Sequence, residues 1–400
     1  MKRQQAFKFQ LNISTGIAEQ LMRFAGSSRF IYNKALALQK MRYENGEKKL
    51  TYAGLCKQLG VWKKETETAW LNDCHSQILQ QSLKDLDRAY TNFFAKRAGF
   101  PKFKRRGVHD SFRYPQGIKC DQENKRIYLP KIGWVRYRKS RMVLGEIRNV
   151  TISRSGTKWY VSIQTEREVS VPLHPGVSSI GIDLGVAKFA KLSDGTEFAS
   201  INCYKHHQER LAAYQRQLKN KTKFSQNWKK AQLKISNLHH KIANIRRDYL
   251  HKTTNTISKN HAMIFIEDLQ IKNMSKSAVG TKAVPGRNVN AKRGLNKSIL
   301  DQGWFEFRRQ LEYKQAWLGG EVVAVPAHHT SQTCPLCGHI DAMNRQTQET
   351  FACVKCGYEN NADLVGAINI LRAGHARLAG GEMVQLGRSM KQEPAEVTYA

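Results

Sequence analysis

The chain has 400 residues and a mass of 45.7 kDa, more than one ordinary compact core requires, so two or three domains are expected. Its 66 Lys and Arg against 32 Asp and Glu give a net charge of +34, which indicates a polyanionic partner. We expect this partner to be nucleic acid and not a membrane surface, because the positive charges are spread through segments that look folded. No stretch approaches the roughly 20 apolar residues of a membrane span, and the first residues lack the apolar region of a secretory signal, so we expect a cytoplasmic protein without a membrane partner.

The N-terminal half begins with an amphipathic strand at about 5–11, which is followed by helical patterns. Apolar residues recur at helical spacing in three stretches, 15–41, 52–59 and 76–94. We therefore expect a helical domain over 12–98. From 112 to 165 the pattern changes to short alternating runs joined by turns, which predict strands. Because the first strand precedes the helices, the sequence predicts a β-barrel over 1–11 and 99–170 that is interrupted by the helical domain.

Basic residues are concentrated at two places that are candidates for nucleic-acid binding. One is the segment after the predicted helical domain, where they surround aromatic residues; the other is the long basic helical region 205–257. The candidate contacts are Lys102, Lys104, Arg105, Arg106, Arg246 and Arg247. A solvated charged surface is the alternative interpretation of both places. Contacts of this kind supply affinity for phosphate and little sequence choice.

A linker at 169–178 with two prolines marks the boundary to a second unit. It opens with an apolar strand ending at Asp183 and a hairpin at Asp194-Gly195. Predicted elements then follow in order: one or two helices at 205–257, a strand at 262–267, a loop to about 294, a helix at 305–317, a strand at 321–325 and a helix at 362–371. The residues after 373 are expected to be disordered.

Three carboxylates occupy positions suited to catalysis. Asp183 and Glu267 each end an apolar strand, where an unpartnered charge is costly, and Asp363 lies in the first turn of an apolar helix. Singly, each has an ordinary structural explanation, such as a turn cap or a helix-dipole partner. Together, in a strand-hairpin-helix-strand order, they match the RNase H-like way of gathering acids. Asp268 is interpreted as structural, because adjacent strand residues point to opposite faces.

The chemistry predicted for this cluster is phosphodiester hydrolysis with two Mg²⁺ ions. Such ions lie about 3.5–4 Å apart and take hard oxygen ligands, which carboxylates supply. In this hypothesis Asp183 bridges the ions, while Glu267 and Asp363 each complete one coordination sphere. The products would be a 5′-phosphate and a 3′-hydroxyl.

Four of the eight cysteines form two C-x-x-C pairs, Cys334 with Cys337 and Cys353 with Cys356. Each pair is followed by a glycine, and this spacing is typical of a closed tetrahedral Zn²⁺ site with a structural role. A redox dithiol is the alternative, but it lacks a thioredoxin-like context. His328, His329 and His339 flank the pairs and are not needed as ligands.

Several phrases of the sequence resemble the TnpB family of transposon-encoded nucleases. In the second half these are 181–186 (GIDLGV), 266–269 (IEDL), 330–334 (TSQTC) and 361–363 (NAD); in the first half they are 29–33 (RFIYN) and 99–104 (GFPKFK). The resemblance covers nearly the whole chain. It departs from the family habit after Asp363, where the chain reads LVGA, and at His328-His329.

The resemblance implies an α+β multidomain protein related to type V CRISPR effectors. The implied domains are a wedge β-barrel (1–11 and 99–170), a helical recognition domain (12–98), an RNase H-like RuvC α/β nuclease (178–327 and 361–373), a zinc-ribbon insertion (328–360) and a disordered tail (374–400). It also implies a DNA endonuclease, guided by a transposon-derived RNA, that cuts double- and single-stranded target DNA next to a short flanking motif. We expect a monomer within the ribonucleoprotein.

Two alternatives use the same residues. A transposase catalysing strand transfer would need the same fold and acids. A non-catalytic zinc-ribbon regulator would use only the basic charge and the cysteines. Cleavage, strand transfer and plain binding therefore distinguish the three hypotheses.

Overall fold

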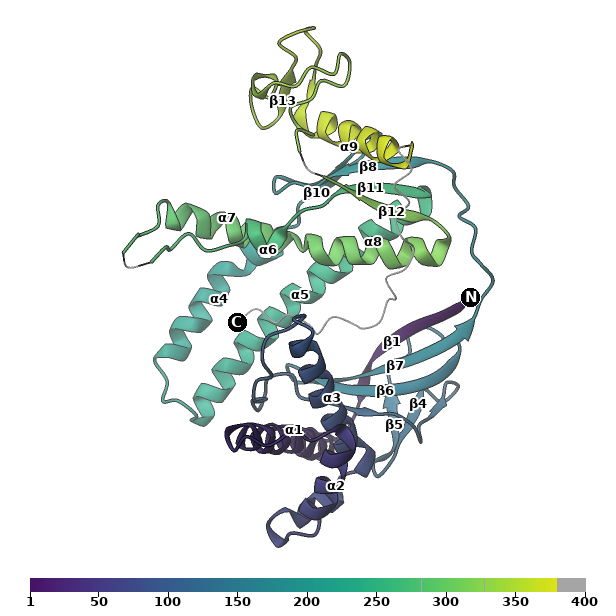
Figure 1. Cartoon of the computed structure of the whole chain (residues 1–400), viewed down its shortest axis with the longest axis vertical. Coiled ribbons are helices and arrows are strands. Elements are labelled where there is room, and N and C mark those ends of the chain that lie inside the picture. The colour runs from purple at the N-terminus through teal and green to yellow at the C-terminus, as the bar shows by residue number, and fades with distance from the viewer. Residues whose placement is uncertain (282, 327, 380–400) are drawn as a thin grey trace. The chain divides into compact units, whose positions relative to one another are not determined.

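The computed structural model describes residues 1–281, 283–326 and 328–379 (Figure 1). The chain is an α+β protein of two compact units. One comprises Met1–Ser170 with Gln232–His240, and the other comprises Val171–Ala231 with the chain from Lys241 onward. Among the described helices, none combines the length and the apolar character required to cross a membrane.

The first unit is built on a seven-stranded antiparallel sheet with the order β2-β6-β7-β1-β5-β4-β3. Its strands are β1 (Lys2–Asn12), β2 (Ser111–Tyr114), β3 (Lys119–Asp121), β4 (Arg126–Leu129), β5 (Gly133–Tyr137), β6 (Glu146–Ser155) and β7 (Lys158–Glu168). In β1, Phe7, Phe9 and Leu11 are buried on one face, so the predicted amphipathic strand is confirmed. β1 lies between β7 and β5, and strands far apart in the sequence are thus joined across the helical insert.

Four helices of the first unit come between β1 and β2, and the segment Gln232–His240 adds the middle of a longer helix, α5 (Gln226–Asn260). The four are α1 (Thr15–Glu44), α2 (Tyr52–Trp62), the 3₁₀ helix η1 (Thr66–Asp73) and α3 (Ser76–Phe94). Ser14 and Thr51 cap α1 and α2 with side-chain oxygens that accept backbone N–H groups, which satisfies donors that the first turn leaves open. The buried faces of these helices share one hydrophobic core with the sheet, so helices and sheet form a single unit.

The second unit contains a five-stranded sheet with the order β10-β9-β8-β11-β12. The strands are β8 (Ser179–Asp183), β9 (Lys188–Leu192), β10 (Glu197–Ala199), β11 (Met263–Glu267) and β12 (Glu321–Val325). β8, β11 and β12 are parallel, while β9 and β10 are antiparallel additions. β8 and β9 are too close in sequence for a crossover, whereas the parallel partners are connected through helices.

Helices cover both faces of this sheet (Figure 1). The helices of the second unit are α4 (Cys203–Lys219), α5 (Gln226–Asn260) apart from Gln232–His240, α6 (Ile271–Met274), α7 (Val289–Gln302), α8 (Trp304–Leu318) and α9 (Ala362–Ala379). Ile180, Ile182 and Ile266 pack with residues of α5 and α8, whereas Phe265 packs with Ile370 of α9. Because side chains alternate along a strand, Asp183 and Glu267 lie on the α9 side.

α9 packs unusually close to the sheet because small residues line the contact. A Cβ built on Gly181 of β8 would lie 2.2 Å from the backbone oxygen of Ala367, and one built on Gly374 would lie 2.0 Å from the Phe265 ring. Both distances are far below van der Waals contact. Glycine is therefore required at both positions, and it brings the start of α9 next to the end of β8.

Two sequence predictions about this unit were wrong in extent. The loop predicted to run to about 294 contains α6 and the first turns of α7, which starts at Val289. The disordered tail predicted from 374 begins too early, because α9 continues to Ala379 and Gly374 is part of its contact with Phe265. Residues 380–400 of that predicted tail lie outside the described residues.

Candidate active site and cysteine cluster

Two of the three predicted acids lie side by side at one edge of the second sheet. Asp183 is the last residue of β8 and Glu267 is the last residue of β11. The two strands are parallel neighbours, paired up to Ile182 and Ile266. Parallel strands end at the same edge of a sheet, which is where sites form in open α/β sheets. The fold therefore brings together two side chains that are 84 positions apart in the sequence.

The third acid reaches the same edge from α9. Asp363 is the second residue of the helix, and Asn361 Oδ1 accepts hydrogen bonds from the backbone N–H groups of Asp363 and Leu364, which fixes the first turn. One turn further on, a Cβ built on Gly366 would lie 3.3 Å from Oδ2 of Asp183. Asp183 is thus packed against the helix that carries Asp363.

The pKa values of all three acids are raised. Burial and the nearby carboxylates of Glu267 and Asp363 raise the pKa of Asp183 to about 7. Burial also raises the pKa of Glu267 and of Asp363 above their ordinary values. Buried like charges at one edge are relieved by a bound cation, and three carboxylates are the oxygen donors that Mg²⁺ takes, so the residues fit such an ion.

Side chains that the sequence reasoning did not single out support two of these acids. The Thr330 hydroxyl donates to Oε1 of Glu267 at 2.7 Å, and Asn369 Nδ2 donates to the backbone oxygens of Thr330 and Thr333. Arg345 lies 3.5 Å from Asp363 Oδ1. Thr330 stood in a phrase noted only for its family likeness. Arg345 and Asn369 carry no local pattern, because their partners are distant in sequence.

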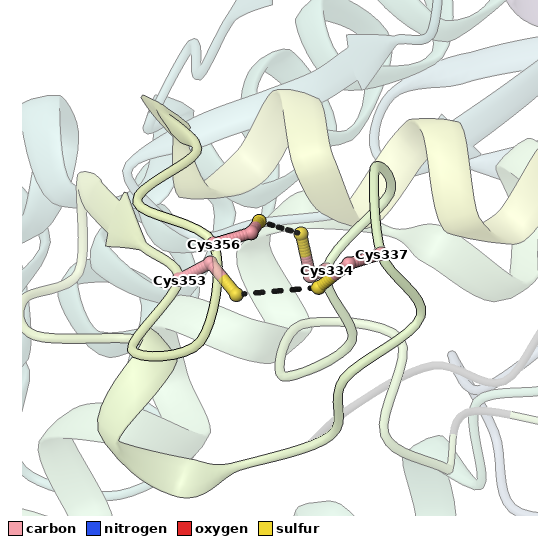
Figure 2. Close-up of side chains that lie close together, drawn as sticks. All are labelled: Cys334, Cys337, Cys353 and Cys356. Carbon is pink, nitrogen blue, oxygen red and sulfur yellow. Dashed lines mark hydrogen bonds between the residues drawn. The ribbon is translucent and has the colours of Figure 1, made fainter.

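The four predicted cysteines converge on one point, as Figure 2 shows. The sulfur atoms all lie within 4.8 Å of one another, with Cys334 3.6 Å from Cys356 and Cys337 3.6 Å from Cys353. Tetrahedral Zn²⁺ with Zn–S bonds of about 2.3 Å requires sulfurs about 3.8 Å apart, so the cluster fits a metal ion of this kind. Among the described residues, it is the only such group of at least three potential ligands, and the three carboxylates are not gathered as tightly.

The two cysteine turns have the same backbone geometry. Gly338 N–H donates to the Cys334 oxygen at 3.0 Å, and Gly357 N–H donates to the Cys353 oxygen at 2.9 Å. Both glycines have positive φ, +71° and +74°, which explains why a glycine follows each pair. The cysteine segment includes the short helix η2 (Ala342–Asn344) and the strands β13 (Thr350–Ala352) and β14 (Glu359–Asn361).

The remaining candidate residues have different environments. Asp268 forms an ion pair with Arg308 at 2.6 Å, in keeping with a structural role. The segment from Lys102 to Arg106 is exposed, and Lys104 Nζ lies 4.2 Å from the centre of the Tyr32 ring.

Arg246, which was predicted to contact nucleic acid, is instead paired with an acid inside the protein. Its guanidinium lies 2.5 Å from Oδ1 of Asp301, a carboxylate that is almost fully buried. Removing one partner of such a pair leaves a buried charge uncompensated. The fold therefore uses Arg246 to hold α5 to α7, and we omit it from the proposed contacts. Arg247 next to it is exposed.

Comparison with known proteins gives matches along most of the chain. Residues 162–278 match the OrfB family of IS605 elements, described as "Probable transposase", residues 304–370 match the "Cas12f1-like, TNB domain", and residues 1–48 match the helix-turn-helix domain of the same OrfB family. The chain is 60% identical to the "Putative RNA-guided DNA endonuclease InsQ" of Escherichia coli K12 over the full length of both. It is 31% identical to a "Putative RNA-guided DNA endonuclease" of Streptomyces pristinaespiralis, with 98% of this chain and 97% of the relative covered.

Among solved structures, the chain is similar to Cas12f1 in its complex with sgRNA and target DNA. The TM-score is 0.56 at 12% identity, with 92% of this chain and 98% of the Cas12f1 chain covered, which shows a shared fold. The fold and the cysteine cluster thus define a Cas12f1-like α+β class. Within that class, the full-length relatives show that the chain belongs to the TnpB family, the OrfB family of IS605 elements.

Proposed function

We propose that this protein is an RNA-guided, metal-dependent DNA endonuclease of an insertion sequence. The observation that carries the proposal is the meeting of Asp183, Glu267 and Asp363 at one edge of the second sheet. Its full-length relatives bear the name of RNA-guided DNA endonucleases, which supports the same activity. The net charge of +34 suits a guide RNA and a DNA target held together in a cytoplasmic ribonucleoprotein.

In this proposal the three carboxylates would hold two Mg²⁺ ions, which would supply an activated water and charge stabilisation for the leaving oxygen. The carboxylates of Glu267 and Asp363 are near enough to Asp183 to raise its pKa, which suits the binding of cations by all three acids. Thr330 orients the Glu267 carboxylate and favours its ionised form, because the hydrogen bond lowers the pKa of Glu267 against the effect of burial.

The domains that we propose are those that the family likeness implies. The seven-stranded sheet corresponds to the wedge barrel, the helices α1 to α3 to the recognition domain, and the five-stranded sheet with its helices to the RuvC nuclease. The cysteine segment corresponds to the zinc ribbon, with one structural Zn²⁺ bound by Cys334, Cys337, Cys353 and Cys356. Lys102, Lys104, Arg105, Arg106 and Arg247 are proposed to contact nucleic acid.

The test begins with the RNA that co-purifies with the protein. After this RNA has been sequenced, the ribonucleoprotein is incubated with Mg²⁺ and a library of DNA that is matched to it. We expect cleavage next to a short common motif, and loss of cleavage with retained binding in Asp183→Asn. Strand-transfer products with transposon ends would favour the transposase, which the family description also names. Absence of bound RNA would contradict guidance, and activity unaffected by Asp183→Asn would favour the non-catalytic regulator.

A further inference from the structure

The second unit contains a cavity of about 280 Å³ beside the proposed active site. Its wall includes Leu184, Ile266, Glu267, Trp304, Phe305 and Arg308. Binding sites for drug-sized molecules have volumes of about 300–1,000 Å³, so this cavity suits one small planar group. None of the steps proposed for the three acids uses it.

The cavity and the acids lie at the same edge of the sheet. Leu184 follows Asp183 in the chain, and Ile266 precedes Glu267. Leu184 and Ile266 pack on the α8 side of the sheet, whereas Asp183 contacts α9. A nucleotide whose phosphate lies at the carboxylates can therefore extend over the strand ends into the cavity.

The arginines in and around the cavity wall are paired with carboxylates of the protein. Arg308 contacts Asp268 at 2.6 Å and Glu312 at 2.9 Å, and Arg309 contacts Glu306 at 2.7 Å. Guanidinium groups held by carboxylates are poorly suited to bind a phosphate in addition. Apart from Glu267, the rest of the wall is mainly apolar, so the cavity suits a neutral group more than a charged one.

Two aromatic residues at the start of α8 add specific chemistry. The side chain of Phe305 is in the wall although the residue is 65% exposed, so its ring is open to a stacking partner. Stacking of nucleobases on aromatic rings is tolerant of sequence, because every base has a π-face. Trp304 is buried, and its indole N–H has no acceptor among the described residues.

We propose that the cavity binds one nucleobase of the single-stranded DNA next to the bond that is cut, with Phe305 as its stacking platform. This inference rests on the proposed nuclease function. Phe305 is a substrate-positioning residue in it, because its ring contacts the base and thereby sets the position of the phosphate at the acids.

The experiment measures single-turnover cleavage of guide-matched DNA that carries one abasic nucleotide at successive positions around the cut. The wild-type protein, Phe305→Ala, Phe305→Trp and Leu173→Ala are compared. Leu173→Ala is the control for the loss of an exposed apolar side chain, because Leu173 is 90% exposed, lies in the linker 169–178 and is not in the cavity wall. Thermal unfolding of each variant is measured in parallel, and an exposed ring should leave it unchanged.

We expect one abasic position to slow the wild-type protein by about tenfold, in line with the loss of one base stack. The Phe305→Ala variant should cleave intact DNA about as slowly as the wild-type protein cleaves that abasic DNA. Its cleavage rate should fall no further when the same nucleotide is abasic. The Phe305→Trp variant should cleave at the wild-type rate, and so should Leu173→Ala. The base site would be overturned, and the nuclease function left intact, by either of two results. One is a wild-type cleavage rate for Phe305→Ala; the other is that the rate losses caused by the variant and by the abasic nucleotide add up. A wild-type ribonucleoprotein without any cleavage would overturn both.

Discussion

The Thr330 hydroxyl donates a hydrogen bond of 2.7 Å to Oε1 of Glu267, and this bond ties the segment before the cysteine cluster to the end of β11. Asn369 of α9 holds the same segment by binding the backbone oxygens of Thr330 and Thr333. The chain between the sheet and the cysteines is therefore not a passive connection. It positions one of the proposed metal ligands, so changes in this segment should alter catalysis.

Thr330→Val should weaken cleavage with little loss of folding. A hydrogen bond to a charged group contributes about 1.5–3 kcal/mol, so a loss of about tenfold or more at limiting Mg²⁺ is expected. The pKa of Glu267 should rise further, because the bond that favours its ionised form is gone. Raising the pH or the Mg²⁺ concentration should recover part of the rate, and Thr330→Ser should behave like the wild type. Equal rates for the Val and Ser variants at all Mg²⁺ concentrations would rule out this role.

Gly181→Ala should separate α9 from β8 and impair both stability and cleavage. The added Cβ would lie 2.2 Å from the Ala367 oxygen, and overpacking of this kind costs about 1–3 kcal/mol or more. Gly60→Ala in α2 is the matched control, since a Cβ there meets nothing within 4 Å. In chemical unfolding, Gly181→Ala should have a clearly lower free energy of unfolding than Gly60→Ala. Gly60→Ala should be as stable as the wild type or slightly more stable. Equal stability of both variants would contradict the close packing.

Cys353→Ser should abolish zinc binding. We expect one zinc ion per wild-type chain by atomic spectroscopy, none in Cys353→Ser, and one in Cys56→Ser, whose cysteine lies in α2 outside the cluster. Without the ion, the segment 328–360 should become sensitive to protease, because a structural zinc orders a small loop-rich segment. A full zinc content in Cys353→Ser would show that this thiolate is not a ligand.

Asp183→Asn should stabilise the metal-free protein at high pH. The pKa of Asp183 is raised from 3.8 to about 7, so its ionised form opposes folding. This cost is absent below about pH 4, grows between pH 4 and 7, and is fully present above pH 7, where it reaches at most about 4 kcal/mol. In EDTA, the free energy of unfolding of the variant should therefore exceed that of the wild type at pH 8 and equal it at pH 4. A gain that does not depend on pH would be evidence against the raised pKa.

Much of this site could be predicted from sequence because its determinants are local. Asp183 and Glu267 each follow a short apolar run, and such a run fixes both the strand and the point where it ends. The two cysteine pairs predict their own geometry through spacing and the following glycines. These features do not depend on the rest of the chain.

The parts that sequence reasoning missed depend on tertiary contacts. α7 starts in a segment rich in Gly, Asn and Lys, where intrinsic helix propensity is low, and its buried Ile299 and Asp301 supply the packing that the local sequence does not reveal. Arg246 reads as a surface cation until the fold places Asp301 beside it. The last helix was predicted to end at 371, yet α9 continues to Ala379, and Gly374 lets it pass close to Phe265.

The proposed nuclease activity is most directly tested by the rate at which the purified ribonucleoprotein cuts one linear DNA, with a matched and a scrambled guide, in Mg²⁺ and in EDTA. We expect cleavage only with the matched guide and Mg²⁺, leaving 5′-phosphate and 3′-hydroxyl ends. We expect none by Asp183→Asn, Glu267→Gln or Asp363→Asn ribonucleoproteins that still bind the DNA. Cleavage that does not depend on the guide, or that survives loss of Asp183, would contradict this proposal.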